Sequence, residues 1–281
     1  MNMEDLRKEI ENADMVLVGI SEFFDLGEPS IELGIVSEVL REEEADWLIV
    51  PVMEAANDSL ERNLAALTKL AEQIKKKNCF IVSLAQSEYV ANIDWREGRL
   101  VMPNGRAVFA QCSEACEKSE IESLNDTQID KMHELCSGFV KNLQTIQSVV
   151  NESAVKIPLP EEVQRAMRLI QMREQIRGEV QSLKEQATKL LGKCPCCGAQ
   201  RVLNVVQAKH YDQRGYQKKW EFYSKWLYGS MSRKLLLLRL GGNHSQIGLL
   251  REPFEKIAEL NPQAKLIAQN DENVNDWLEN V

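Results

Sequence analysis

The sequence predicts an α/β fold: a Rossmann-like parallel sheet with helices on both faces, together with a small lobe that binds zinc and carries a helical insertion. Three observations support this prediction. Short apolar runs alternate with helical patterns early in the chain, the same alternation returns near its end, and two cysteine pairs lie in the stretch between them. Strands that alternate with helices of about 10–15 residues are typical of parallel sheets.

The N-terminal elements follow this alternation. Residues 15–20, MVLVGI, form a short apolar run of the kind expected for a buried strand. Apolar residues at helical spacing predict a helix over 30–44, where Pro29 fits the first turn because it has no N–H to satisfy. A second helix, with a leucine stripe, is predicted from Leu60 to Ile74, before a run of lysines. We expect two further strands in this part of the chain, at 47–52 and 79–84.

The middle of the chain changes character. Short strand-like pieces with turns, including a Pro-Asn-Gly turn at 103–105, occupy residues 89–111. Apolar residues spaced by three or four predict helices over 129–150 and 161–190. Because prolines separate the two helices, we expect them to form an antiparallel pair. An aromatic helix is predicted around 220–227.

The C-terminal part returns to the strand and helix alternation. Residues 235–240, LLLLRL, form the most apolar strand pattern of the chain and run into a glycine loop. A helix near 250–260 and a strand over 265–269 follow. We therefore predict two parts: a Rossmann-like domain of residues 1–105 and 230–281, and a small lobe of residues 106–229 that holds the zinc site and the helical insertion. The role of the insertion, residues 120–190, is left open by the sequence.

Composition restricts the classes of function. The chain has 281 residues and a formal net charge of −9, which argues against non-specific nucleic-acid binding. Apolar runs stay well short of the roughly 20 residues that a membrane span needs, and the charged N-terminus is unlike a secretory signal. We expect a cytoplasmic protein with neither nucleic-acid nor membrane partners.

The cysteine spacing predicts a structural zinc site. Cys112 and Cys116 are spaced C-x3-C, and Cys194 and Cys197 lie in a CPxCG knuckle. Such pairs suit a tetrahedral zinc, and a site of four thiolates is structural because it leaves no position for substrate. Cys196 is an alternative ligand, and the first pair has the alternative interpretation of two ordinary buried thiols. Core positions are predicted for the two isolated cysteines, Cys79 and Cys136.

Two glycine-containing loops are candidates for ligand binding. Gly19 and Ser21 follow the first predicted strand, and Gly241, Gly242 and Asn243 follow the LLLLRL strand. In a parallel sheet both loops open at the carboxyl edge, where α/β folds bind ligands. Glycines in such loops let backbone N–H groups approach a phosphate closely.

Three motifs together resemble the sirtuin family. They are QCSEAC at 111–116, CPCCG at 194–198, and LLLLRLGGNHSQIGLLREPFEKIAELNPQAKLIAQN at 235–270. The likeness is strongest to the class M branch, bacterial sirtuins associated with macrodomain proteins, and extends from about Phe109 to Asn270 apart from a longer helical insertion. It implies a Rossmann-type sheet with a zinc-bearing lobe. It also implies NAD-dependent deacylation of protein lysines or, as in class M members, ADP-ribosylation of a carrier protein.

The resemblance also implies where the cofactor would lie. It assigns Gly241, Gly242 and Asn243 to the adenosine side, Asn270 to a contact with adenine or ribose, and Gly19 and Ser21 to the remainder of the first phosphate loop. The family's GAGxS loop is reduced here to VGIS at 18–21, and the asparagine and aspartate that hold the nicotinamide ribose and amide are replaced within SLAQSE at 83–88. Asn104 stands at the position of the catalytic base, and an amide does not take up the proton that a base must accept. The resemblance therefore predicts a degenerate NAD site.

Three functions remain as alternatives. The first is a sirtuin-like protein that binds NAD or an ADP-ribose-type nucleotide with weak or lost catalysis. The second is an active NAD-dependent protein ADP-ribosyltransferase or deacylase. The third is a zinc-stabilised scaffold that binds a protein partner without any nucleotide. The expected partners are thus a nucleotide small molecule and, in two of these cases, a protein substrate or partner.

Overall fold

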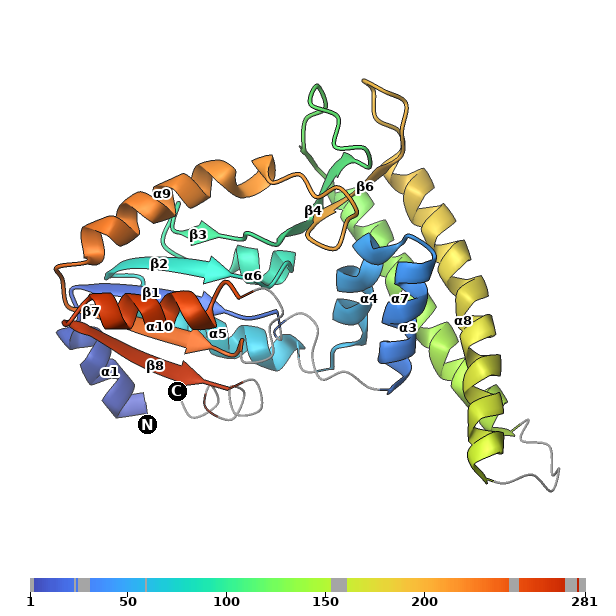
Figure 1. Cartoon of the computed structure of the whole chain (residues 1–281), viewed down its shortest axis with the longest axis horizontal. Coiled ribbons are helices and arrows are strands. Elements are labelled where there is room, and N and C mark those ends of the chain that lie inside the picture. The colour runs from blue at the N-terminus through green and yellow to red at the C-terminus, as the bar shows by residue number, and fades with distance from the viewer. Residues whose placement is uncertain are drawn as a thin grey trace. The chain divides into compact units, whose positions relative to one another are not determined.

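The chain divides into two compact units. A computed structural model describes residues 3–22, 24, 31–58, 60–152, 161–242, 248–270 and 277 (Figure 1). The first, here called the sheet unit, comprises Met1–Gly27, Asn57–Arg106 and Gln213–Val281. The second, the cysteine unit, comprises Glu28–Ala56 and Ala107–Asp212. These boundaries differ from the predicted ones, because 28–56 belongs to the cysteine unit, whereas Arg106 and 213–229 belong to the sheet unit.

The sheet unit is built on five parallel strands. Their order is β3-β2-β1-β7-β8, and every pairing that joins them is parallel. The central strand is in register with both neighbours, so that Met15 lies opposite Asn78 on one side and Leu235 on the other. The strand bounds are β1 Met15–Ile20, β2 Asn78–Ser83, β3 Leu100–Val101, β7 Leu235–Leu240 and β8 Ala264–Gln269. The strands predicted at 15–20, 79–84, 235–240 and 265–269 are confirmed to within one residue.

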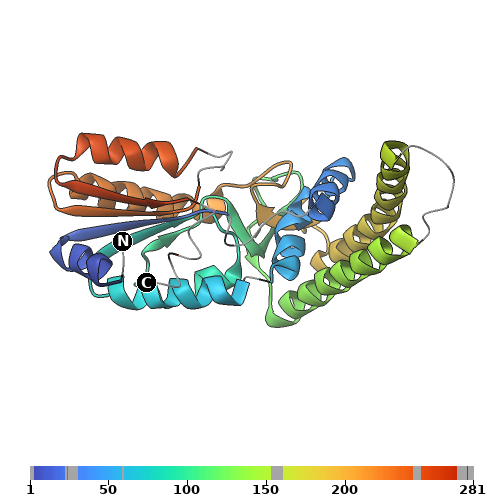
Figure 2. The same cartoon turned by 90° about the horizontal axis from the view of Figure 1, so that it is seen from below.

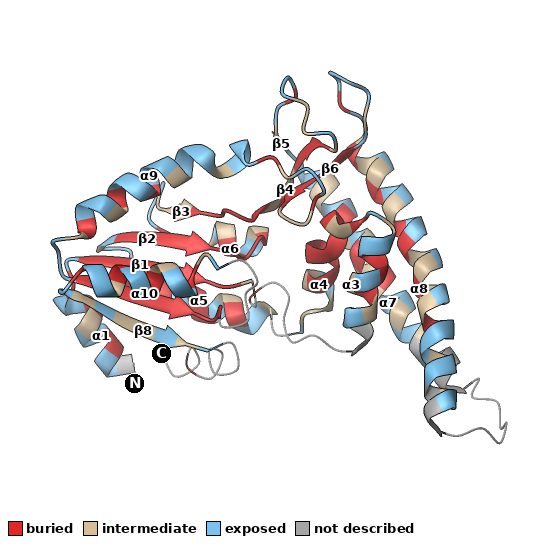
Figure 3. Cartoon of the chain, viewed as in Figure 1, coloured by how far each residue is buried: buried red, intermediate tan, exposed pale blue. Residues whose placement is uncertain are grey.

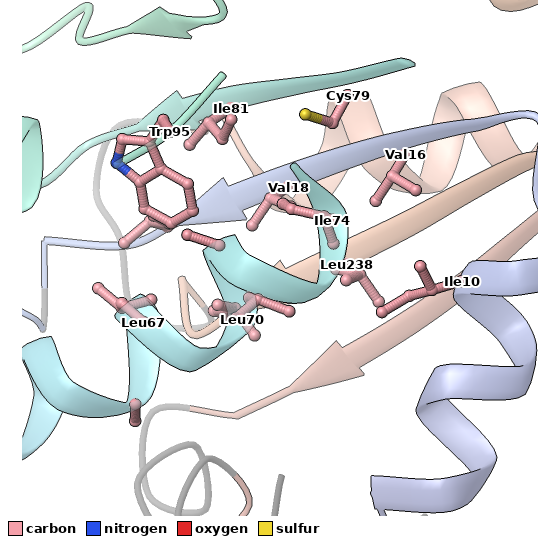
Figure 4. Close-up of a cluster of buried hydrophobic side chains, with 14 of the residues drawn as sticks. Ile10, Val16, Val18, Leu67, Leu70, Ile74, Cys79, Ile81, Trp95 and Leu238 are labelled. Atoms are coloured by element: carbon pink, nitrogen blue, oxygen red, sulfur yellow. The ribbon is translucent and has the colours of Figure 1, made fainter. Parts of the chain in front are cut away.

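Helices cover both faces of this sheet, as predicted. Side chains alternate along β1, so Val16 and Val18 pack with helices α1 and α5, whereas Met15 and Leu17 pack with α9 and α10. Figure 4 shows the first of these two cores, and Figure 3 shows how completely the central strands are buried. Strands that are buried on both faces need apolar side chains throughout, which explains their continuous apolar runs. The helix bounds are α1 Met3–Asn12, α5 Leu60–Ile74, α6 Glu88–Asn92, α9 Arg214–Ser230 and α10 Arg251–Leu260.

The strand predicted at 47–52 is wrong. This segment forms a short 3-10 helix, η1 (Asp46–Leu48), followed by the helix α4 (Ile49–Ala56). A short apolar run does not distinguish a strand from a helix that is buried on most sides, and residues 47–53 are all buried. Pro51 fits because it lies in the first turn, where its missing N–H has no helical acceptor to lose.

The cysteine unit contains the predicted pair of long helices. α7 (Asp126–Glu152) and α8 (Glu161–Leu191) run side by side in opposite directions (Figures 1 and 2). A reciprocal capping box starts α7, because the Gln128 N–H donates to Asn125 Oδ1 and the Asn125 N–H donates to Gln128 Oε1. Gly192, with φ of 74°, ends α8 in the left-handed conformation that glycine adopts easily. Across the described residues, the helices lack the combination of length and apolar character that a membrane crossing requires.

A three-stranded sheet and a further helix complete the cysteine unit. The sheet has the order β5-β4-β6, with β4 at Gly105–Cys112, β5 at Glu122–Ser123 and β6 at Arg201–Val205. The predicted helix at 30–44 is confirmed as α3 (Ile31–Glu42). Two arginines of α8 join this helix to α3. Arg173 donates to Glu42 at 2.5 Å, and Arg177 donates to the same carboxylate at 2.9 Å. Both arginines lower the pKa of Glu42, Arg173 most strongly.

Gly19 offers a test of the packing between the sheet and α10. A Cβ at this position would lie 2.7 Å from Phe254 Cζ and 2.9 Å from Leu250 Cδ2. We expect Gly19→Ala to lower the free energy of unfolding by about 1–3 kcal/mol, because the ring must move to relieve the overlap. Gly229→Ala in α9 is the matched control: nothing lies within 4 Å of its Cβ, and alanine should raise stability by up to about 1 kcal/mol. Urea unfolding followed by circular dichroism measures both, and equal stabilities of the two variants would contradict this account.

Candidate functional site

The carboxyl ends of β1 and β7 form a topological switch point. β2 and β3 lie on one side of β1, while β7 and β8 lie on the other, so the strand order changes direction between β1 and β7. The Ser21 N–H donates to the Leu240 carbonyl at 3.0 Å, and the Gly241 N–H donates to the Gln269 carbonyl at 2.9 Å. These bonds place Ser21, Gly241 and the next residue after β8, Asn270, along one edge. Open α/β sheets bind ligands at this kind of edge.

A tight glycine turn follows β7. Gly241 and Gly242 have φ of 75° and 84°, a region in which other residues are strained by roughly 1–2 kcal/mol. A Cβ on Gly242 would lie 3.8 Å from the Ser21 Cβ and 3.4 Å from Leu250 Cδ1, so this backbone passes close to both residues. The turn is therefore buried backbone beside the start of α10, where helical N–H groups favour anions.

Gly19, one of the residues predicted for the cofactor, is not part of a loop at this edge. Gly19 lies inside β1, paired with Val82 and Arg239, and its bare Cα accommodates Phe254 rather than forming a loop. The close packing against Phe254 therefore explains why this position is a glycine. Asn243 lies outside the described residues.

Polar side chains are buried at the carboxyl ends of β1, β2 and β7. Elsewhere the strands present apolar side chains to their helices. Each of the buried polar residues at this edge is at most 5% exposed: Ser21, Ser83, Gln86, Ser87, Asn104 and Arg239. Burial of polar groups costs free energy, so their concentration at one edge of an otherwise apolar sheet is typical of a binding site for a polar ligand.

Sequence analysis did not single out Ser83, Gln86, Ser87 or Arg239 as binding residues. SLAQSE was recognised only as a departure from the sirtuin pattern. The available signal was the abrupt change from an apolar run to polar residues, and the single arginine within LLLLRL. Arg239 Nη1 donates to the Gly241 carbonyl at 3.2 Å, so a buried guanidinium braces the glycine turn. A cation in this place also favours an anionic ligand nearby.

Asn104 is fixed at the end of β2. Its Nδ2 donates to the Leu84 carbonyl at 3.1 Å, and the Leu84 N–H in turn donates to the Ile20 carbonyl at 2.7 Å. Because the amide nitrogen is bound and an amide does not accept protons near neutral pH, Asn104 acts as a brace between two strand ends. It does not supply a general base at this position.

The two distant cysteine pairs meet in the cysteine unit. The sulfur atoms of Cys112, Cys116, Cys194 and Cys197 all lie within 4.8 Å of one another. In a tetrahedral site with Zn–S bonds of about 2.3 Å, the sulfurs are about 3.8 Å apart. The hairpin of α7 and α8 returns the chain to its starting point, which brings together residues that are far apart in sequence. This cluster could therefore bind zinc.

Backbone turns shape both cysteine pairs. The Gly198 N–H donates to the Cys194 carbonyl at 2.9 Å, and Gly198 has φ of 77°. In the first pair Ala115 has φ of 44°, which is unusual for a residue with a side chain. Such strained conformations cluster at ligand sites, where surrounding structure holds them in place.

The charges of the cluster favour a divalent cation. A hydrogen bond from the Ser119 hydroxyl, aided by the N–H groups of residues 196 and 197, lowers the pKa of the Cys194 thiol to about 6. The Ala199 N–H favours the thiolate of Cys197, but hydrogen bonds and charge from Cys112 and Cys194 outweigh it and raise the pKa of Cys197 to about 12. Negative charge on one cysteine thus disfavours ionisation of Cys197, and a divalent cation at the centre of the cluster would offset that charge.

The remaining cysteines lie outside this group of four. Cys196 is exposed, and its Sγ donates to the Lys118 carbonyl at 3.3 Å. Cys79 and Cys136 are buried, and burial raises the pKa of both thiols, to about 12 for Cys136. Raised pKa values keep these two thiols protonated and inert, as expected for core positions.

Buried polar contacts support the strands that carry the cysteines. Gln111, next to Cys112, accepts hydrogen bonds at Oε1 from Asn204 Nδ2 at 2.6 Å and from the Asp212 N–H at 2.9 Å. Arg201 of β6 donates to Glu122 at 2.6 Å. These bonds tie β4, β5 and β6 into one frame, so the position of the first cysteine pair is set by the sheet.

Comparisons with known proteins give only a distant structural likeness. Protein-family models and curated proteins yield no match to the chain. Among solved structures it is similar to a sirtuin from a study of substrate affinity, with 11% identity and a TM-score of 0.47 over 96% of this chain and 86% of that one. It is also similar to a Sir2 structure with deacetylated p53 peptide and 3′-O-acetyl ADP-ribose, with 11% identity and a TM-score of 0.46 over 100% and 97% of the two chains. At this distance the likeness carries no functional argument.

Metal analysis of the purified chain tests the cysteine cluster. We expect about one equivalent of zinc per chain, and a loss of most of it in Cys194→Ser, because one thiolate ligand is removed. Cys196→Ser is the matched control, since it alters a neighbouring thiol of the same knuckle that is not in the group of four. Less than half an equivalent in the wild type, or equal loss in both variants, would refute this ligand set.

Proposed function

We propose that the sheet unit binds NAD or an ADP-ribose-type nucleotide at its carboxyl edge, and that catalysis by the sirtuin mechanism is weak or lost. The observation that carries this proposal is the group of buried polar side chains at the ends of β1, β2 and β7, beside the glycine turn at the switch point. The five-stranded parallel sheet with helices on both faces supplies the frame on which such sites occur.

The edge suits the parts of such a nucleotide. A pyrophosphate needs N–H donors and positive charge, and the edge offers the buried cation of Arg239 and the N–H groups at the start of α10, beside the glycine turn. Ribose hydroxyls need side chains that both donate and accept hydrogen bonds. Ser21 and the exposed Asn270 are side chains of that kind at this edge.

Weak or lost catalysis follows from the chemistry at Asn104. The motif likeness to sirtuins implies Asn104 as the counterpart of the catalytic base, and its buried amide donates to the Leu84 carbonyl. An active ADP-ribosyltransferase or deacylase would need its base from another residue. The geometry around β2 therefore favours nucleotide binding over turnover.

We further propose that zinc at the four cysteines stabilises the cysteine unit and takes no part in a reaction. Four thiolates complete the coordination of the ion, so no position remains for substrate. Clustered cysteines serve as metal ligands rather than disulfide partners in a reducing compartment, so this role is compatible with the predicted cytoplasmic location.

A scaffold role is the second candidate, favoured by one surface of the cysteine unit. Near the start of α8 the apolar residues Val163, Met167 and Ile170 recur at helical spacing and are 43%, 53% and 64% exposed. An exposed apolar stripe of this kind is typical of protein-binding helices. This surface is compatible with nucleotide binding in the other unit, so the two proposals are not exclusive.

Isothermal titration with ADP-ribose tests the nucleotide site. The wild-type chain should bind, and Gly242→Ala should weaken binding roughly tenfold or more, because a side chain at φ of 84° distorts the turn beside Ser21. Gly98→Ala is the matched control: Gly98 has φ of 69° but precedes β3, at the opposite end of the sheet. Both variants should lose similar stability, and only the first should lose affinity. Absence of binding by the wild type would refute the proposal.

Incubation with NAD tests the proposed loss of catalysis. We expect nicotinamide release at no more than the rate of a boiled control. The reason is that Asn104 takes the predicted position of the base, and an amide does not accept the proton. Chromatographic detection of nicotinamide measures this directly. Release that depends on active protein concentration would show that another residue supplies the base, and would favour the active-enzyme alternative.

A further inference from the structure

One buried amide in the sheet unit has no role in the structure described so far. Asn63 of α5 is 2% exposed, and neither its Nδ2 nor its Oδ1 has a hydrogen-bond partner among the described residues. Buried polar groups in folded proteins are almost always hydrogen-bonded. An amide left with both donor and acceptor open is therefore a feature that a ligand would explain.

Asn63 lies on the face of α5 that packs on the sheet. The buried residues of this helix recur at helical spacing and are apolar apart from this one: Asn63, Ala66, Leu67, Leu70, Ala71 and Ile74. Figure 4 shows Leu67 toward the arrowheads of the strands and Ile74 toward their starts. Asn63, one turn before Leu67, continues this stripe toward the carboxyl edge.

Element lengths place Asn63 level with the end of β2. From Asn63 to Ile74 the helix rises about 17 Å, at about 1.5 Å per residue. From Asn78 to Ser83 the strand covers about the same distance, at about 3.3 Å per residue. The two elements are joined by the short turn 75–77, so Asn63 and Ser83 lie at the same height. Ser83 has the same parity as Cys79 and Ile81, which face α5, so both polar side chains lie on one side of the sheet.

We propose that Asn63 is a specificity-determining residue of the carboxyl-edge site, and this proposal rests on the proposed nucleotide binding. A side-chain amide offers a donor and an acceptor side by side. It pairs with a group that presents an acceptor and a donor in the same way. The edge of an adenine ring has this arrangement, and so does a carboxamide such as that of nicotinamide. The shared chemistry is a planar group with adjacent donor and acceptor.

The same substitution at two buried asparagines tests this role. Asn63→Leu should raise the melting temperature of the ligand-free chain by a few degrees, because an open polar group is replaced by an apolar one of similar size. It should also weaken ligand binding about tenfold or more. Asn261→Leu is the matched control. Its Nδ2 donates to the Ser230 and Arg233 carbonyls at 3.1 Å, and it precedes β8 at the opposite end of the sheet. That variant should lose stability and keep its affinity.

Two titrants distinguish the source of the recognised group. ADP-ribose carries adenine without a carboxamide, and nicotinamide mononucleotide carries the carboxamide without adenine. A loss of affinity in Asn63→Leu confined to ADP-ribose assigns adenine, and a loss confined to the mononucleotide assigns the carboxamide. Unchanged affinity for every titrant that the wild type binds overturns the role of Asn63 and indicates a buried water as its partner. A wild-type chain that binds neither titrant refutes the proposed function itself.

Discussion

The pairing of β1 between β2 and β7 is the interaction on which the sheet unit depends. These three strands are in register over their whole length, so the carboxyl ends of segments from both ends of the chain meet at one edge. The close approach of α10 to β1 depends on Gly19, because a Cβ there would overlap with the Phe254 ring. The position of α10 and of the glycine turn before it thus follows from the backbone of a single strand.

The cysteine unit depends on a different constraint, the return of the chain through the hairpin of α7 and α8. The capping box at Asn125 and the left-handed Gly192 define the start of one helix and the end of the other. The antiparallel helices between these two residues bring Cys194 back to the end of the unit where α7 began. Because Cys112 and Cys194 oppose the ionisation of Cys197, a cation at the centre of the cluster would stabilise the cysteine unit.

Buried polar residues at the carboxyl edge cost stability, and their arrangement indicates why they persist. Asn104 and Arg239 are bound to backbone carbonyls and hold the ends of β2 and β7. Among the described residues Asn63 has no such bond at either its Nδ2 or its Oδ1. Binding sites commonly retain groups that weaken the empty protein, since the same groups provide specificity once the ligand is present.

Periodicity in the sequence determined most of the elements by itself. The strands at 15–20 and 235–240, the two long helices and the cysteine ligand pairs were all predictable, because each depends on local spacing of apolar residues or thiols. Residues 47–52 were not, since a short apolar run has no period that separates a buried helix from a strand. Only the tertiary structure decided that Gly19 serves packing, that Cys197 rather than Cys196 joins the cluster, and that Asn63 faces the sheet with no partner in the described part of the chain. Each of these depends on which segments meet in space, and no local pattern records that.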